Sequence, residues 1–401
     1  MSGKLNILFI CNKSPWPPHE GGPIAMNNLI EGTLAAGHNV KVLAINTNKY
    51  NVDPVNIPEK YKKLTGIELV YIDLGIVPIK AFLNLFTGKS YHVERFISDD
   101  FRKKLTQILS NQKYDIVQIE TLFMSPYIDT IRQFSDASIV LRAHNIEHLI
   151  WKRVASITKN PIKKAYLTHL ANTLEVYEKG ILNKYDGIIP ISSKDEVFFK
   201  SESTKPVTTV SFGVDTNKLE SNSISKKEHS LFHIGAMNWI PNEEGIRWFL
   251  ENVWPKVNIE LPELKLYLAG REMPEWLTNL KIKNVVVVGE VPDAYEFINS
   301  HTISIAPLFS GSGIRIKIIE SMALGKAVIS TTIGAEGISY TNNENIMIAD
   351  DANSYFESIK KLYTDVEKGT HIGENARALI FEEHNNTNLI KKMIQFYRSI
   401  L

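Results

Sequence analysis

The sequence predicts an α/β protein made of two doubly wound domains. Short runs rich in Val, Ile and Leu recur along the chain, amphipathic stretches of helical length separate them, and the alternation starts afresh after a polar stretch at 211–230. Near-continuous apolar runs joined by helices are typical of parallel strands buried on both faces of a sheet. At 401 residues, each half is long enough to bury a core of its own.

In the first half, six apolar runs predict the strands of one Rossmann-like sheet. They lie at 5–11, 40–45, 67–72, 115–119, 139–143 and 187–191. Amphipathic stretches at 24–36, 99–109 and 162–182 predict the covering helices.

The second half repeats the pattern. Its strands are expected at 231–234, 264–269, 285–288, 302–306, 327–330 and 345–348, and its helices at 242–257, 294–299, 316–324 and 352–363. Because 211–230 has the composition of a linker, we expect one domain over 1–210 and another over 211–386. The last predicted helix, 387–400, could pack on either domain by its pattern alone.

Composition excludes several classes of protein. Lys plus Arg number 45 and Asp plus Glu 44, so a net charge of +1 does not favour bulk attraction to nucleic acid. The single cysteine, Cys11, excludes an intramolecular disulfide framework and fits a reducing cytosol. The first residues lack a secretory signal, and no window reaches the length of a membrane span. We therefore expect a cytoplasmic protein.

Two glycine-containing loops are candidate anion sites. Gly21-Gly22-Pro23 follows the first strand and opens a helix, where backbone N–H groups can face a diphosphate. Taken alone, this motif is better explained by a Pro/Gly-rich loop that only turns the chain. The second loop, 304–331, is more specific, because Gly311 and Gly313 precede a predicted helix that carries two cations and a carboxylate.

That helix begins with Arg315 and Lys317 and continues with Glu320. Diphosphate recognition needs an approachable backbone together with positive charge, and Glu320 could accept hydrogen bonds from two ribose hydroxyls. The alternative is that these three residues form an ordinary solvated helix face.

The string His144-Asn-Ile-Glu147-His148 matches the H-x-x-E-H pattern of a zinc peptidase. Asn145 is a good N-cap, however, so we expect the helix to start after His144, with the two histidines on different faces. His144 would then follow the carboxyl end of the strand at 139–143, where open α/β sheets bind ligands. For His148 a packing role is expected.

The order of several motifs resembles that of retaining family 4 glycosyltransferases of the GT-B fold. The string "GSGIRIKIIESMALGKAVIST" followed by "GAEGI" resembles their donor-site signature. Further similar blocks are "EGGPIAMNNLIEGTLAAGHNVKVLA", "RAHNIEH", "VSFGVDTNKL", "HIGAMNWIPNEEGIRWF", "LYLAGRE" and "VVVVGEVPD". The resemblance implies two Rossmann-like domains facing each other across a cleft. It also implies that the last helix crosses back, adding 387–401 to the first, acceptor-side domain.

The same resemblance implies roles for individual residues. Glu320 matches the carboxylate that binds the nucleotide ribose. Gly313 and Ile314 match the loop whose backbone approaches the diphosphate and the sugar. Gly22 matches the glycine under the donor phosphate, and His144 the histidine near the donor sugar.

Val291 lies where family members contact the base. The sequence departs from the family pattern at Ser312, where many relatives have a glutamate that binds sugar hydroxyls. A second departure is Gly235-Ala236, because relatives have a Gly-Arg pair there and a lysine shortly after it. We expect Arg315 and Lys317 to replace those cations beside the leaving diphosphate.

The resemblance therefore implies a glycosyltransferase of hexosyltransferase type in cell-surface polysaccharide synthesis, and we expect it to be metal-independent. Its partners would be a UDP- or GDP-sugar and a glycan or lipid-linked acceptor, and no cofactor or D-x-D metal motif is expected. A nucleotide-sugar epimerase on this fold and a catalytically silent sugar-nucleotide-binding protein are the alternatives. The stretch 77–96 fits either peripheral contact with the inner membrane face or a core helix and loop.

Overall fold

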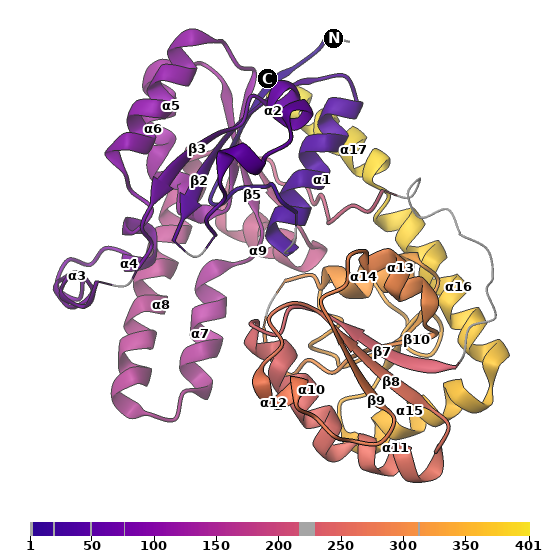
Figure 1. Ribbon diagram of the computed structural model, residues 1–401. Coiled ribbons are helices and arrows are strands. Elements are labelled where there is room, and N and C mark those ends of the chain that lie inside the picture. The colour runs from indigo at the N-terminus through magenta and orange to yellow at the C-terminus, as the bar shows by residue number, and fades with distance from the viewer. Residues whose placement is uncertain (1–2, 19–20, 49, 76, 216–228, 312) are drawn as a thin grey trace. The chain divides into compact units, whose positions relative to one another are not determined.

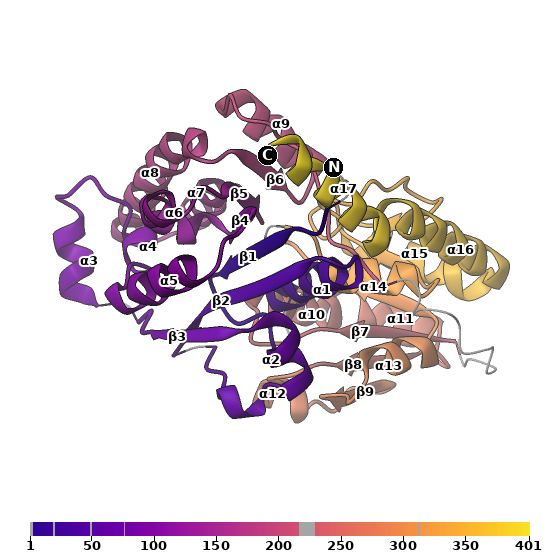
Figure 2. The same cartoon turned by 90° about the horizontal axis from the view of Figure 1, so that it is seen from above.

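The computed structural model describes residues 3–18, 21–48, 50–75, 77–215, 229–311 and 313–401. They form two compact units, Met1–Gly213 with Asn386–Leu401, and Val214–Asn385. Each unit contains one six-stranded parallel sheet with helices around it (Figures 1 and 2). The predicted α/β class with two Rossmann-like sheets is confirmed. Most of the predicted linker, 216–228, lies outside the described residues.

The first unit has the strand order β3-β2-β1-β4-β5-β6. Its strands are β1 (Asn6–Cys11), β2 (Asn39–Thr47), β3 (Glu68–Ile72), β4 (Ile116–Glu120), β5 (Ser138–Ala143) and β6 (Gly187–Pro190). Its helices are α1 (Gly21–Ala35), α2 (Glu59–Thr65), α3 (Pro78–Asn84), α4 (Tyr91–Glu94), α5 (Asp99–Asn111), α6 (Ile128–Phe134), α7 (Glu147–Ile157), α8 (Pro161–Ile181), α9 (Ser193–Glu202) and α17 (Asn386–Ser399). Short 3₁₀ turns are η1 (Pro54–Asn56), η2 (Leu122–Tyr127) and η3 (Leu182–Lys184).

The second unit has the order β12-β11-β10-β7-β8-β9. Its strands are β7 (Ser230–Ile234), β8 (Lys265–Ala269), β9 (Val285–Gly289), β10 (Ile303–Ala306), β11 (Ala327–Ser330) and β12 (Met347–Ile348). Its helices are α10 (Ile240–Asn252), α11 (Trp254–Glu260), α12 (Glu275–Thr278), α13 (Ala294–Ser300), α14 (Ile316–Ala323), α15 (Ala352–Thr364) and α16 (Val366–Glu383).

The core of the first unit lies on both faces of its sheet. Successive side chains of a strand point to opposite faces, so Leu8 and Ile10 of β1 join one apolar cluster while Ile7 and Phe9 join another. All four are fully buried. This burial on both sides explains why the strands are continuous apolar runs in the sequence.

The final helix packs in the first unit, as the family resemblance implied. Met393 of α17 lies in the same apolar cluster as Met26 of α1. A Cβ at Gly32 of α1 would come within 2.7 Å of Ile390, so glycine permits the close packing of α17 on α1.

Two of the differences between the predicted and the observed helices have a clear physical reason. The helix expected at 242–257 is two helices, α10 and α11, because Pro255 at the start of α11 has no N–H for a continuous ladder. The second difference is α16, which was not predicted. A Cβ at Gly373 of α16 would collide with the backbone of Gly325, so this helix depends on a close tertiary contact.

Both sheets have the same topology. In each, the first strand lies between the second and the fourth, and the chain changes direction across the sheet between β1 and β4 and between β7 and β10. The carboxyl ends of strands at such a switch point form the ligand-binding crevice of open α/β sheets.

Candidate functional site

Three polar side chains meet at the switch point of the second unit. Lys317 of α14 donates from Nζ to Oδ1 of Asn242, which belongs to α10, and lies 3.4 Å from Nε2 of His233 on β7. Nδ1 of His233 is 3.0 Å from the carbonyl oxygen of Ile305 on β10. That carbonyl can only accept, so Nδ1 carries the ring proton and Nε2 accepts from the lysine.

The electrostatics of this cluster favour an incoming anion. Burial, and then the charge of Lys317, hold the pKa of His233 well below its ordinary range, so the imidazole is neutral. Burial and the neighbouring Arg315 in turn lower the pKa of Lys317 well below its ordinary value. A phosphate beside these two side chains would favour their charged forms, because an opposite charge offsets the loss of hydration.

The loop before α14 brings backbone and cation together. Gly311 and Gly313 have φ angles of +97° and +79°, a region that L-residues rarely adopt. Arg315 donates to the Gly313 carbonyl, and its guanidinium lies 5.4 Å from the ring centroid of Trp239, with the Lys317 ammonium at 5.9 Å. Among the described residues no side chain caps α14, so the N–H groups at its very start can face an anion.

Arg315 is buried, and Lys317 and Glu320 are half-buried, so the three do not form a solvated helix face. Ile314 is half-buried in the same loop, and Ser312 lies outside the described residues.

Glu320 lies one turn after Lys317 on α14. The hydroxyl of Tyr295 on α13 donates to its Oε1 at 3.2 Å. Burial raises the pKa of Glu320 to about 7, an effect that the tyrosine hydrogen bond opposes. Val291, predicted to contact the base, packs against an apolar cluster that includes Phe297 of α13. These residues come from the segments that follow β9 and β10.

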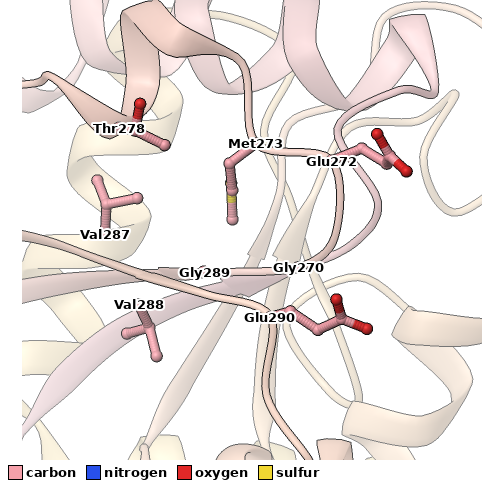
Figure 3. Close-up of a pocket in the computed structure, with 8 residues that line it drawn as sticks. All are labelled: Gly270, Glu272, Met273, Thr278, Val287, Val288, Gly289 and Glu290. Carbon is pink, nitrogen blue, oxygen red and sulfur yellow. The ribbon is translucent and has the colours of Figure 1, made fainter.

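A pocket of about 290 Å³ opens beside the ends of β8 and β9. Met273 points from the loop before α12 toward Gly270 and Gly289, and the carboxylates of Glu272 and Glu290 lie to one side (Figure 3). The chain just after β7 packs its backbone against Gly270, which lines this pocket. A Cβ on Gly270 would collide with the carbonyl oxygen of Gly235, which follows β7.

In the first unit, a carboxylate and a histidine pair at the end of β4. Oε2 of Glu120 is 2.6 Å from Nε2 of His144, and Nε of Arg142 is 3.9 Å from the same oxygen. Gln118 donates to the other carboxylate oxygen. Glu120 is fully buried, so it is not a surface residue. The bond to Nε2 orients the imidazole and leaves its Nδ1 for another partner.

The adjoining end of β1 adds further polar groups. A Cβ on Gly22 would come within 2.9 Å of Cε and 3.1 Å of Nζ of Lys13, so the glycine lets that lysine lie against the start of α1. Oδ1 of Asn12 and Oγ1 of Thr121 are buried without a hydrogen-bond partner. Thr121 also has φ +73°, and such backbone strain gathers at ligand-binding sites.

The H-x-x-E-H string serves two separate arrangements. The predicted N-cap at Asn145 is wrong, because α7 begins at Glu147 and its N-cap position is Ile146. The apolar side chain of Ile146 cannot cap the helix. Glu178 of α8 takes that role, accepting from the N–H groups of Glu147 at 3.0 Å and His148 at 3.1 Å. Its Oε2 is also 2.6 Å from Nδ1 of His148.

His148 packs against Phe198 rather than Trp151, with ring centroids 5.6 Å apart, and Trp151 stacks on His92 at 4.0 Å. His144 and His148 thus bond to different glutamates. Across the part of the chain that the structure describes, no group of three or more His, Cys, Asp or Glu side chains is placed to hold a metal ion.

The comparisons agree with this geometry. Residues 228–365 match the family model "Glycosyl transferases group 1". The matched residues lie in the second unit. A protein of Klebsiella pneumoniae, named "Uncharacterized 44.6 kDa protein in cps region", is 23% identical over 97% of this chain and 99% of its own.

Solved GT-B structures share the fold over nearly the whole chain. Sucrose-phosphate synthase of Thermosynechococcus elongatus is 18% identical, with a TM-score of 0.72 and 99% of each chain covered. HepE of Anabaena, solved in complex with UDP-glucose, is 12% identical with a TM-score of 0.65, covering 98% of this chain and all of that one.

Proposed function

We propose that this protein is a glycosyltransferase that moves a sugar from a UDP- or GDP-sugar to a glycan or lipid-linked acceptor. The observation that carries the proposal is the placement of Arg315 and Lys317 at the uncapped start of α14, behind the Gly311–Gly313 loop. Two cations beside an approachable backbone, at a switch point, are what a diphosphate requires. The complex of HepE with UDP-glucose supports a donor of this class.

In the proposed reaction, an acceptor hydroxyl oxygen bonds to the anomeric carbon while the bond from that carbon to the diphosphate breaks. The hydroxyl proton passes to the departing phosphate, on the face that the acceptor approaches, so the anomeric configuration is retained. Arg315 and Lys317 stabilise the charge that builds on the diphosphate, in place of a divalent metal. Glu320 holds the ribose, and His144, oriented by Glu120, binds the donor sugar.

We further propose a role in the synthesis of cell-surface polysaccharide, in the cytoplasm and in peripheral contact with the inner face of the membrane. The name of the Klebsiella relative, which refers to a cps region, supports this role. Its acceptor side would be the first unit, where Asn12 and Thr121 offer unpartnered oxygens to a hydroxylated ligand.

The test is a thermal-shift panel of UDP-, GDP-, ADP- and dTDP-sugars, each with EDTA, magnesium or zinc. We expect one base to raise the melting temperature to the same extent in EDTA as in magnesium. No shift with any nucleotide, or a shift only with zinc, would contradict the proposal.

The donor that binds is then incubated with and without lipid-linked and oligosaccharide acceptors. A transferase forms a product only when an acceptor is present. Conversion of the donor sugar in the absence of acceptor would identify an epimerase, and binding without turnover against every acceptor a silent binding protein.

A further inference from the structure

Two segments of the first unit lack acids, and the second of them is rich in cations. From Leu74 to Val93 and from His148 to Leu174 the sequence contains no Asp or Glu. The second segment holds five cations, Lys152, Arg153, Lys159, Lys163 and Lys164. In a chain whose net charge is +1, this separation makes one region strongly basic.

The structure packs these segments together. Ala81 of α3 lies in one apolar cluster with Ala155 of α7 and Leu167 of α8. In Figure 1 the turn between α7 and α8, residues 157–161, is the lower end of this helical hairpin, and α3 lies beside α8 above it. In both views α3 stands out from the sheet on the side of α8 (Figures 1 and 2).

The outer face of this region is apolar. Large side chains there that the solvent reaches are Val77, Ile79, Phe82, Leu83, Phe86, Ile157 and Ile162, and four of them are more than 70% exposed. Clustered exposed apolar side chains usually mark an interaction site. We name α3 with the turn between α7 and α8 the basic–apolar surface.

Its cations are positioned to meet an anionic partner. Lys159, Lys163 and Lys164 are exposed at the turn, and among the ion pairs of the described residues none involves them. Lys152 and Lys89 contribute less, because they pair with Glu175 and Glu94. Apolar side chains next to unneutralised lysines are the composition of a segment that lies in a bilayer interface.

We propose that the basic–apolar surface binds the surface of an anionic phospholipid membrane. Phe82 and Phe86 enter the boundary between headgroups and acyl chains, and Lys159, Lys163 and Lys164 contact phosphate groups. Within the described residues no helix has the length and apolar character to cross a bilayer, so this contact is peripheral. The proposal rests on the peripheral membrane contact proposed above, for which it names the surface, and it does not depend on the proposed reaction.

The test is co-sedimentation of the full chain with vesicles, without donor or acceptor. We expect binding to phosphatidylcholine–phosphatidylglycerol vesicles that weakens as salt rises, and little binding to pure phosphatidylcholine. Replacing Lys159, Lys163 and Lys164 by Gln should lower the affinity roughly a hundredfold, at about tenfold or less per charge. Replacing Phe82 and Phe86 by Ser should also release the protein.

A matched control removes similar side chains elsewhere in the same unit. Val55, Lys60 and Lys63 are also exposed, and V55S/K60Q/K63Q should bind as the unaltered chain does. Thermal unfolding checks that each variant folds. Failure of the unaltered chain to bind phosphatidylglycerol vesicles, or equal loss in the control, would overturn the proposal. The proposal would also be overturned if the unaltered chain formed a dimer and bound no vesicles, and if replacing Phe82 and Phe86 by Ser made that dimer dissociate.

Discussion

At the switch point of the first sheet, between β1 and β4, a buried carboxylate holds a histidine. At the switch point of the second sheet, between β7 and β10, a neutral histidine contacts a lysine, and an arginine lies near that lysine. The two sheets have the same strand topology, so the difference lies in the side chains that the strand ends present. One fold places a cation pair suited to phosphate in the second unit and an oriented imidazole in the first, as expected when function depends on the site rather than the fold.

The largest expected effect tests the cations of the second unit. Replacing Arg315 and Lys317 together by Ala should reduce donor affinity by roughly a thousandfold or more, because two charge-assisted contacts to the diphosphate are lost. Isothermal titration with the donor found in the panel measures this. In the matched control Lys281 and Lys283, which are exposed on the same unit, are replaced by Ala and affinity should not change. Unchanged affinity in the first variant would mean that the diphosphate binds elsewhere.

The next largest effect tests whether His144 of the first unit acts in sugar transfer, while the second unit binds the donor. His144→Ala should slow transfer roughly a hundredfold, as for loss of one positioned hydrogen-bonding side chain at a reacting centre. Donor affinity should stay within a few-fold of the unaltered value, because the diphosphate contacts are intact. Kinetics of transfer and titration of the donor together check this. His371→Ala, at an exposed position of α16, is the control. Loss of donor affinity equal to the loss of rate would contradict a role confined to transfer.

The pH dependence of donor binding tests Glu320, with an expected effect of about tenfold. Its pKa is raised to about 7, so the carboxylate that accepts ribose hydroxyls forms as pH rises through that value, and affinity should rise with it. The profile should be flat in Glu320→Gln. Tyr295→Phe removes a hydrogen bond that lowers this pKa, so its profile should move to higher pH. Glu357→Gln, on the surface of α15, should match the unaltered chain.

The raised pKa of Glu320 also predicts how the stability of the folded chain changes with pH. Between its ordinary pKa of 4.5 and about 7, Glu320 binds more protons in the folded chain than in the unfolded chain. Its contribution to stability is therefore lost as pH rises through this window. Thermal unfolding should show that Glu320→Gln gains stability relative to the unaltered chain as pH rises. A difference that shrinks with pH would contradict the raised pKa.

The sequence predicted the strands well and the polar contacts poorly. Strands buried on both faces are apolar over their whole length, so their pattern is local. His233 was missed because it lies within such a run, "SLFHI", where a polar residue among apolar ones was the available signal. Its partner Lys317 is 84 residues along the chain from His233 and 75 from Asn242, which Lys317 also contacts.

The helix start at 145–148 shows the same limit. Asn145 has the right side chain to cap a helix, but the cap comes from Glu178, about 30 residues away. A distant carboxylate overrides the local preference, and no pattern within one helix could have revealed it. Arg315, Lys317 and Glu320 could be selected because their spacing along α14 is local, whereas Tyr295 and Trp239 join them only in the fold.

The smallest effect compares one glycine from each switch point. Gly313 has φ +79°, so Gly313→Ala should cost about 1–2 kcal/mol in loop conformation and lower donor affinity roughly tenfold. Gly22 is not in the left-handed region, and an added Cβ would meet only the flexible end of Lys13. Gly22→Ala should therefore fold normally and weaken the donor a few-fold at most. Equal losses in the two variants, measured by titration, would show that the backbone at Gly22 is as close to the phosphate as that at Gly313.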